Sequence, residues 1–268
     1  MMKKYRFLVL RRIAQIGLLC LYVLGNYAGI KILQGNLSGS LLFEMIPLSD
    51  PFAILQLLFS GAIVGINALV GGLIILVFYG LIVGRAFCSY VCPMNLVTDL
   101  ANYLRRVLNI SYAPLYLSRR IRYVVLFLTL ILSSLFGMAA FEAISPIGMI
   151  HRGIVFGMGF GAFAVLLVFL LDLFVVSHGF CGHLCPLGAF YSLVSKFAFL
   201  KVKYDLDSCT HCMECKKICP EKQVLGLIGK ESGKVIGGEC TRCGRCIEVC
   251  GDNALRFNLL DFAKKEIR

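Results

Sequence analysis

Long apolar stretches separated by short polar segments dominate the first 176 residues of the chain. Four of these stretches are long enough to cross a hydrocarbon core, which requires about 20 apolar residues. Polar interruptions within them are few and include Asn67 and Asp172. The pattern therefore predicts an α-helical membrane protein with four transmembrane helices, at about residues 13–32, 62–83, 123–141 and 156–176.

The basic residues of the connecting segments predict the orientation of these helices. Eleven of them precede the first span or lie between the second and third, whereas the opposite loops contain only Lys31 and Arg152. Because basic loops remain in the cytoplasm, we expect both termini on the cytoplasmic side of a bacterial inner membrane. The N-terminal 30 residues lack a small-x-small cleavage site and are interpreted as a signal anchor.

A shorter apolar segment, Phe52–Ser60, follows Asp50-Pro51 just ahead of the second span. We interpret it as an interfacial or re-entrant helix at the outer surface. The second outer loop is expected at about residues 145–153 and contains His151 and Arg152.

Composition supports a membrane location. The 268 residues are 59% hydrophobic and 16% charged, with a mean hydropathy of +0.82, whereas soluble domains average about 45–50% apolar and about 25% charged residues. The net charge of +12 is compatible with nucleic-acid binding, but the positive-inside pattern accounts for its placement. We expect membrane lipid, and no nucleic acid, as a partner.

From about residue 201 the chain becomes polar, which divides it into a membrane domain (1–200) and a soluble cytoplasmic domain (201–268). The soluble part contains two cysteine runs of the form Cys-x2-Cys-x2-Cys-x3-Cys, which begin at Cys209 and Cys240. This is the spacing of bacterial ferredoxins with two [4Fe–4S] clusters, in which the fourth cysteine of each run binds the other cluster. The spacing predicts an α+β two-cluster ferredoxin-like domain.

Two ligand sets follow from this exchange of the fourth cysteine. Zinc also accepts four thiolates at Cys-x2-Cys spacing, but it would not require eight cysteines in two runs of identical form. We therefore predict one [4Fe–4S] cluster on Cys209, Cys212, Cys215 and Cys250, and a second on Cys240, Cys243, Cys246 and Cys219.

Two further cysteine pairs form an internal repeat. Phe87-Cys88-Ser-Tyr-Val-Cys92-Pro93 and Phe180-Cys181-Gly-His-Leu-Cys185-Pro186 follow the second and fourth predicted spans, at equivalent cytoplasmic ends of two helical hairpins. In a helical turn, cysteines at i and i+4 share one face. Two such pairs that meet would place four thiols at the membrane surface.

Three roles for Cys88, Cys92, Cys181 and Cys185 remain open at this point. They can bind a third metal centre, pass electrons between a quinone and the ferredoxin clusters as redox-active thiols, or pack the hairpins together. His178 and His183 flank the second pair and can join a metal site. The thirteenth cysteine, Cys20, lies in an apolar run, where we expect a small buried hydrophobe.

Few ionisable residues accompany the apolar stretches. Asp172 lies inside the fourth span and is a candidate for a proton path, unless it reaches water from its place near the inner end. His151 and Arg152 can hold a quinol headgroup and accept its proton, or serve only as an interfacial anchor. No histidine lies at mid-membrane, which disfavours a bis-histidine haem and leaves the quinone pool as the expected redox partner.

These features together resemble the NapH family, the membrane ferredoxin-type subunits of periplasmic nitrate reductase systems. The likeness rests on the four spans, His151-Arg152-Gly153, the paired ferredoxin runs and residues 84–99, Gly-Arg-Ala-Phe-Cys-Ser-Tyr-Val-Cys-Pro-Met-Asn-Leu-Val-Thr-Asp. It covers essentially the whole chain. The Cys-x3-Cys-Pro and ferredoxin arrangement alone is shared with NosR-like and CcoG-like membrane proteins.

The resemblance implies an electron-transfer subunit of a quinol dehydrogenase complex. It would oxidise quinol, with menaquinol as the expected form, and pass electrons towards a periplasmic nitrate reductase through the iron–sulfur subunit NapG. The CcoG-like relatives imply a different role, in metal handling or assembly. Cytoplasmic clusters would lie about 30 Å of hydrocarbon away from a periplasmic acceptor, and the sequence supplies no obvious mid-membrane carrier.

Overall fold

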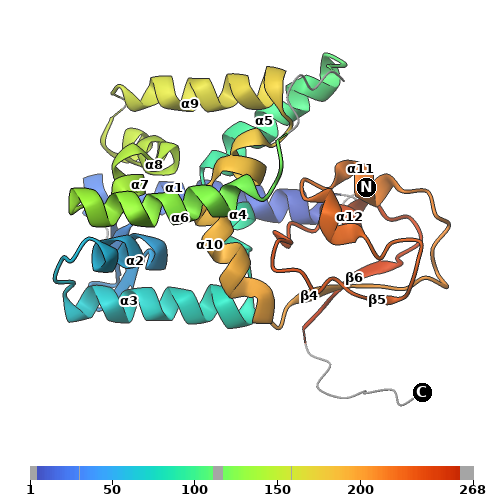
Figure 1. Cartoon of the computed structure of the whole chain (residues 1–268), viewed down its shortest axis with the longest axis horizontal. Helices are drawn as coiled ribbons and strands as arrows, with labels where there is room; N and C mark the ends of the chain where they lie inside the picture. The colour runs from blue at the N-terminus through green and yellow to red at the C-terminus, as the bar shows by residue number, and fades with distance from the viewer. Residues whose placement is uncertain (1–4, 30, 111–116, 158, 260–268) are drawn as a thin grey trace.

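The computed structural model describes residues 5–29, 31–110, 117–157 and 159–259. These residues form a bundle of helices followed by a small α+β domain (Figure 1). The α+β domain lies at one end of the bundle, where it contacts the N-terminal end of α1 (Arg6–Tyr27).

Four apolar helices form the frame of the bundle, and their axes run nearly parallel in Figure 1. Two of them continue into a π-helical turn of five residues. The four are α1; α3 (Ile66–Val77) with η2 (Phe78–Ile82); α6 (Ile121–Phe136); and α9 (Gly161–Leu170) with η3 (Leu171–Val175).

The helix bounds differ from the predicted spans. Among the described residues, α1 is the single helix that combines at least 18 residues with the hydropathy of a membrane span, and the other three are shorter. The first helix ends at Tyr27 instead of 32, and the fourth begins at Gly161 instead of 156. The third ends at Phe136 because Gly137 adopts a left-handed φ of 66°, which terminates a helix.

Shorter elements cover the end of the bundle that lies away from the α+β domain. An antiparallel three-stranded sheet, which the apolar pattern did not predict, has the order β1-β2-β3. The short helix expected after Asp50-Pro51 is confirmed as α2, with the Asp50 carboxylate accepting the Phe52 N–H at 3.2 Å. These elements are β1 (Leu33–Gly35), β2 (Gly39–Leu42), β3 (Ile46–Ser49), α2 (Pro51–Phe59) and α7 (Ala140–Ile144).

The prediction of a loop at about residues 145–153 is wrong, because this segment lies in α8 (Pro146–Phe156). Ser145 caps the helix by accepting the Gly148 N–H at 3.4 Å, and Pro146 occupies the first helical position. Ser145-Pro146 is therefore a local signal for the start of this helix, but the surrounding apolar stretch resembles part of a membrane span.

The internal repeat is visible in the backbone. In each copy an apolar helix ends in a π-helical turn, a short helical turn carries the first cysteine, and another helix starts at or just after the proline. The first copy continues through α4 (Phe87–Tyr90) and α5 (Met94–Val107), and the second through η4 (Phe180–Leu184), α10 (Pro186–Val194) and η5 (Ser195–Phe197).

The C-terminal domain has the predicted α+β architecture. Its central strand, β4 (Lys201–Tyr204), pairs antiparallel with β5 (Gly233–Lys234) and β6 (Leu255–Asn258). The buried side chains of Val202 and Tyr204 face a core that also contains cysteines of both runs. The helices of the domain are α11 (Glu214–Ile218), η6 (Lys222–Leu225) and α12 (Arg245–Val249).

The start of α1 is fastened to this domain. The Glu248 carboxylate of α12 accepts the N–H groups of Phe7 and Leu8 at 2.5 and 2.9 Å, which satisfies two free donors at the positive end of the helix. The ring of Phe7 packs edge-on against Phe257 at 5.3 Å and lies directly over Gly244.

Gly244→Ala should destabilise this junction. Gly244 has a φ of 75°, and a Cβ there would overlap the Phe7 ring; left-handed strain alone costs of the order of 1–3 kcal/mol. We expect the melting temperature of the purified holoprotein to fall by several degrees. Gly251→Ala is the matched control because a Cβ there meets no atom within 4 Å. Equal melting temperatures for the two variants would contradict the described packing.

Candidate metal centres

The cysteines of the two ferredoxin runs fall into two groups in the structure. Four of them line one small cavity of about 20 Å³ beside β4, and they are Cys219, Cys240, Cys243 and Cys246. In the other group, the Cys215 thiol lies within electrostatic range of Cys250, Cys212 and Cys209, which together with burial raise its pKa. The two ligand sets that the spacing predicts are compatible with this grouping and remain predictions.

The backbone of both runs adopts the same unusual conformation. His211 and Met213 have φ values of 60°, and the equivalent Arg242 and Gly244 have φ values of 52° and 75°. Positive φ is uncommon for residues other than glycine and tends to occur where function requires it. The same backbone conformation therefore recurs at equivalent positions of the two runs. In the first run, the His211 N–H donates to the Cys209 sulfur at 3.4 Å.

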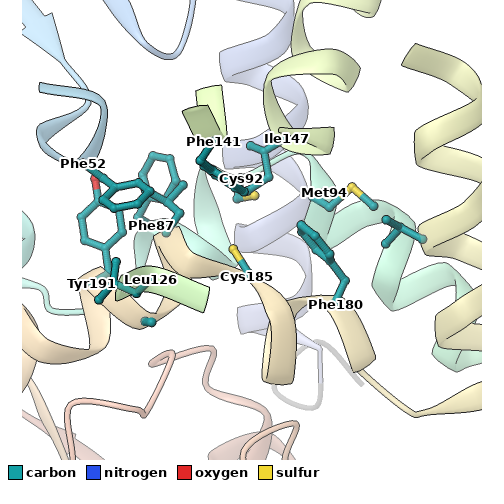
Figure 2. Close-up of a cluster of buried hydrophobic side chains, with 13 residues drawn as sticks. Phe52, Phe87, Cys92, Met94, Leu126, Phe141, Ile147, Phe180, Cys185 and Tyr191 are labelled. Atoms are coloured by element: carbon teal, nitrogen blue, oxygen red, sulfur yellow. The ribbon is translucent and has the colours of Figure 1, made fainter. Parts of the chain in front are cut away.

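The two Cys-x3-Cys-Pro motifs meet in the interior of the bundle. Cys88, Cys92, Cys181 and Cys185 line a single cavity of about 40 Å³, with Cys243 of the ferredoxin domain on its wall. In Figure 2 the sulfur atoms of Cys92 and Cys185 face one another. The aromatic side chains of Phe52, Phe87 and Tyr191 lie on one side of them and Phe180 lies on the other. Phe87 of the first motif stacks on Tyr191 of α10 at 5.0 Å and holds the two repeats together.

Arginine side chains surround this cavity. Arg11 and Arg85 are 1% and 2% exposed, and both line it. Arg85 donates to the Cys181 carbonyl oxygen at 3.3 Å. The Nε atoms of both arginines, and Nη1 of Arg11, have no hydrogen-bond partner among the described residues. Buried donors without partners are costly, so the cavity wall is suited to an anionic occupant.

No three His, Cys, Asp or Glu side chains among the described residues converge closely enough to bind one metal ion. A [4Fe–4S] cube binds each thiolate to a different iron atom, so its ligands need not converge on a single point. Both ferredoxin groups and the Cys-x3-Cys-Pro cavity therefore have donor sets that fit a cube.

Comparison with known proteins gives matches over nearly the whole chain. A model described as a 4Fe-4S dicluster domain matches residues 201–251, and one described as a 4Fe-4S binding domain matches both 64–111 and 156–205. The ferredoxin-type protein NapH of Haemophilus influenzae is 42% identical over 94% of this chain and 90% of its own length, and NapH of Escherichia coli is 43% identical over 94% and 88%. The chain belongs to the NapH family.

The methylamine utilization ferredoxin-type protein MauN of Paracoccus denitrificans is nearly as similar to this NapH-family chain, with 42% identity over 88% of the chain and 84% of the relative. No solved structure matches. The two matches to one 4Fe-4S binding domain confirm the internal repeat. The names and matched domains together show an iron–sulfur, ferredoxin-type electron-transfer protein.

In this NapH-family chain a buried carboxylate joins the ferredoxin domain to the helices. Glu221 accepts hydrogen bonds from Arg85 and Arg122, each at 2.8 Å, and also pairs with Arg119. Burial alone would raise the pKa of Glu221, but the three arginines more than offset it and hold that pKa at about 2. The carboxylate is therefore ionised at any physiological pH.

A second buried carboxylate lies on the opposite side of the cavity. Asp99 of α5 pairs with Arg12 at 2.6 Å, with Arg11 at 3.6 Å and with Arg245 of the ferredoxin domain. Burial raises the pKa of Asp99, but Arg245 and its neighbours lower it below its ordinary value. Arg11, Arg12 and Arg85 are among the eleven basic residues that predict orientation, and no local pattern in the sequence indicates these pairings.

Asp172 has a structural position in η3. It is fully buried and accepts the Phe180 N–H at 3.1 Å, so it fixes the turn that precedes the second cysteine motif. It does not reach water. Asn102 of α5 lies 3.5 Å from the Asp172 carboxylate and 3.4 Å from Nδ1 of His178, which lines the cysteine cavity. His183 is buried but does not line that cavity.

The side chains of His151 and Arg152 lie in different surroundings. Arg152 donates to the carbonyl oxygens of Gly148 and Glu142 near the surface. His151 is buried, its ring lies 4.6 Å from that of Tyr22, and neither ring nitrogen has a partner among the described residues. Burial and the charge of Arg152 lower the pKa of His151 to about 4, so its imidazole is neutral.

The expectation for Cys20 is wrong. The residue is exposed on α1. It is far in sequence from the other cysteines, and it lies outside both cavities that those cysteines line. An exposed position on an apolar helix is compatible with lipid contact, which the hydrophobic pattern alone does not distinguish from burial.

Glu221→Ala should loosen the ferredoxin domain from the helices. Removing one partner of a buried ion pair leaves uncompensated charge and costs about 3–5 kcal/mol. We expect faster hydrogen exchange in 201–259 and a lower melting temperature of the holoprotein. Glu214→Gln is the control, because its pair with Lys217 is exposed and surface pairs contribute about 0–1 kcal/mol. Similar exchange rates in both variants would show that Glu221 does not hold the domains together.

Proposed function

We propose that this chain is a membrane-embedded quinol dehydrogenase subunit, which takes electrons from quinol into iron–sulfur clusters. The four apolar helices would form its membrane domain. Each of them exposes large apolar side chains, as Ile13, Leu73, Phe127 and Phe163 illustrate. Exposed apolar surface of this extent is expected where lipid covers it.

The orientation proposal rests on charge. The basic residues around the cavity and the start of α6 lie at the end of the bundle that carries the ferredoxin domain. Since basic segments remain in the cytoplasm, the clusters and both termini would be cytoplasmic. The β1–β3 sheet, α2 and α7 would then lie towards the outer surface.

The cluster ligands would be the two cysteine groups of the ferredoxin domain, Cys209, Cys212, Cys215 and Cys250, and Cys240, Cys243, Cys246 and Cys219. The cavity shared by the second group and the matched backbone of both runs support this assignment. When bound, each cluster would accept and release one electron at a time. The protein supplies thiolates, backbone N–H donors such as that of His211, and nearby arginines that favour the reduced state.

The observation that carries the quinol proposal is an amphipathic groove of about 750 Å³ between α1, α5, α11 and α12. Leu8, Leu96 and Ile218 give it apolar walls, while Arg12 and Arg106 are hydrogen-bond donors. Quinone sites combine such apolar walls with a few polar groups that orient the headgroup. The groove shares Arg11, Asp99 and Arg245 with the cysteine cavity, so an occupant would lie beside the proposed redox centres.

Oxidation of one quinol releases two electrons and two protons. The protons would have to pass from the groove to water, and the carboxylates of Asp99 and Glu248 line that groove. His151 is a second candidate for the headgroup site, because its buried ring nitrogens have no hydrogen-bond partner among the described residues and could hydrogen-bond a quinol hydroxyl. Ile147, one turn before His151, lines the cysteine cavity, so that site would also lead to the same thiols.

By its resemblance to NapH, the chain would pass electrons towards a periplasmic nitrate reductase through NapG. The similarity to MauN leaves methylamine utilization as a second setting for the same quinol chemistry. Metal handling, as in CcoG-like proteins, is supported less well by the cysteine cavity. Cys92 and Cys185 are buried, whereas a carrier must exchange its cargo with partners.

Leu100→Trp should slow reduction by quinol. Leu100 lines the groove and is 53% exposed, so a Trp there would fill the groove without entering the core. In anaerobic proteoliposomes we expect cluster reduction by menaquinol to slow about tenfold, which corresponds to roughly 1.4 kcal/mol, with unchanged reduction by dithionite. EPR of the reduced clusters measures both rates.

Leu135→Trp is the matched control, because Leu135 is exposed on α6 and lies outside the groove. A parallel His151→Gln variant distinguishes the two candidate headgroup sites, since only the true site should affect the quinol rate. If menaquinol fails to reduce the clusters of the unmodified protein, quinol oxidation by this chain is ruled out.

A further inference from the structure

The four thiols of the Cys-x3-Cys-Pro motifs form one enclosed site that comes from two separate repeats. Cys88 and Cys92 belong to the first repeat, Cys181 and Cys185 to the second, and all four line the same cavity. Cys92 and Cys185 are buried, and the other two are partly buried. Thiolates are ligands of iron–sulfur clusters, and a [4Fe–4S] cluster takes four of them.

Arginines line the cavity, and each also pairs with a carboxylate: Arg85 with Glu221, and Arg11 and Arg245 with Asp99. Arg11 and Arg85 are almost fully buried, yet three of their nitrogen atoms have no hydrogen-bond partner among the described residues. Arg245 also lines the cavity. An iron–sulfur cube with four thiolates carries net negative charge, which these arginines would compensate.

The matches to a family model also indicate that the two repeats together supply the ligands of one cluster. One model described as a 4Fe-4S binding domain matches residues 64–111 and 156–205. Each matched segment contains only two cysteines, which is half of the four thiolates that a [4Fe–4S] cluster requires. Each repeat alone is therefore an incomplete site, and the fold completes it by bringing the two repeats together.

We propose that Cys88, Cys92, Cys181 and Cys185 hold a third [4Fe–4S] cluster, shared between the two repeats. Two contacts at the cavity wall would favour it. The Cys185 sulfur accepts the Gly188 N–H at 3.3 Å, and Gly188 has no side chain to displace the Arg85 guanidinium, which a Cβ would approach to 2.7 Å. N–H donors to sulfur and buried arginines are features that tune cluster potentials.

The position of this cluster would shorten the distance that electrons must cross within the membrane. Gln15 of α1 donates to the Ser89 and Cys92 carbonyl oxygens at 2.9 and 3.5 Å, so the cavity lies beside the interior of this helix. At a rise of about 1.5 Å per residue, Gln15 lies roughly 13 Å from the start of α1. The cluster would therefore lie inside the bundle, with Cys243 linking it to the second ferredoxin cluster. This role as an electron carrier rests on the proposed function, whereas the ligand assignment does not.

Iron and sulfide analysis of anaerobically purified protein tests the assignment without any variant. Three cubes give about twelve iron atoms per chain and two give about eight. We expect about twelve, together with Mössbauer spectra in which all the iron belongs to [4Fe–4S] clusters. About eight irons, or one copper or zinc ion on these thiols, would overturn the proposal.

Single replacements then locate the third cluster. Cys92→Ser and Cys185→Ser should each remove about four irons and one EPR signal while the ferredoxin signals remain. Cys20→Ser, outside all three cysteine groups, should remove none. A protein with eight irons that quinol still reduces would refute the third cluster and leave the proposed function standing. A protein with twelve irons that quinol cannot reduce would support the third cluster and refute the proposed function.

Discussion

The burial of one carboxylate among three arginines determines how the two parts of this molecule fit together. Glu221 follows the last cysteine of the first ferredoxin run by two residues, and its partners lie in both hairpins of the helical bundle. A charged group at that depth is stable only when it is paired. The position of Glu221 therefore fixes the ferredoxin domain over the mouth of the bundle, and it also holds Arg85 and Arg122 in place.

Closure of this interface creates the chemical environment of the cysteines. Asp99 and its arginines form a second junction on the other side, so cationic groups from both parts surround the Cys-x3-Cys-Pro cavity. The cavity wall includes Cys243, which also lines the cavity of the second ferredoxin group. Thiols from the bundle and from the ferredoxin domain thus lie in a continuous series. That arrangement suits stepwise electron transfer better than a rigid packing role for the hairpin cysteines.

Local signals in the sequence were sufficient to predict a ferredoxin-type domain with α+β architecture at the C-terminus. The Cys-x2-Cys-x2-Cys-x3-Cys spacing is a local constraint, because a short loop can direct its thiols in few ways. Helix bounds were less predictable, since Arg11 and Arg12 lie within α1 only because Asp99 pairs with them from a distant helix. The start of α8 was missed because its Ser145-Pro146 signal lies in an apolar stretch that resembles part of a span. The partners of Glu221 are separated from it by about a hundred residues or more, and no local pattern specifies such pairs.

The ferredoxin domain and the Cys-x3-Cys-Pro thiols of the helical bundle are held together, and we propose that they act as one redox unit. EPR of the fully reduced protein, recorded with and without Glu221→Ala, tests it most directly. In the unmodified protein we predict broad spectra, because a [4Fe–4S] cluster in the bundle would interact magnetically with those of the ferredoxin domain. In the Glu221→Ala variant the interface is loosened, and we predict that this magnetic interaction is lost. Spectra that are identical in the two proteins, or a protein that binds zinc and has no paramagnetic centre on reduction, would contradict this account.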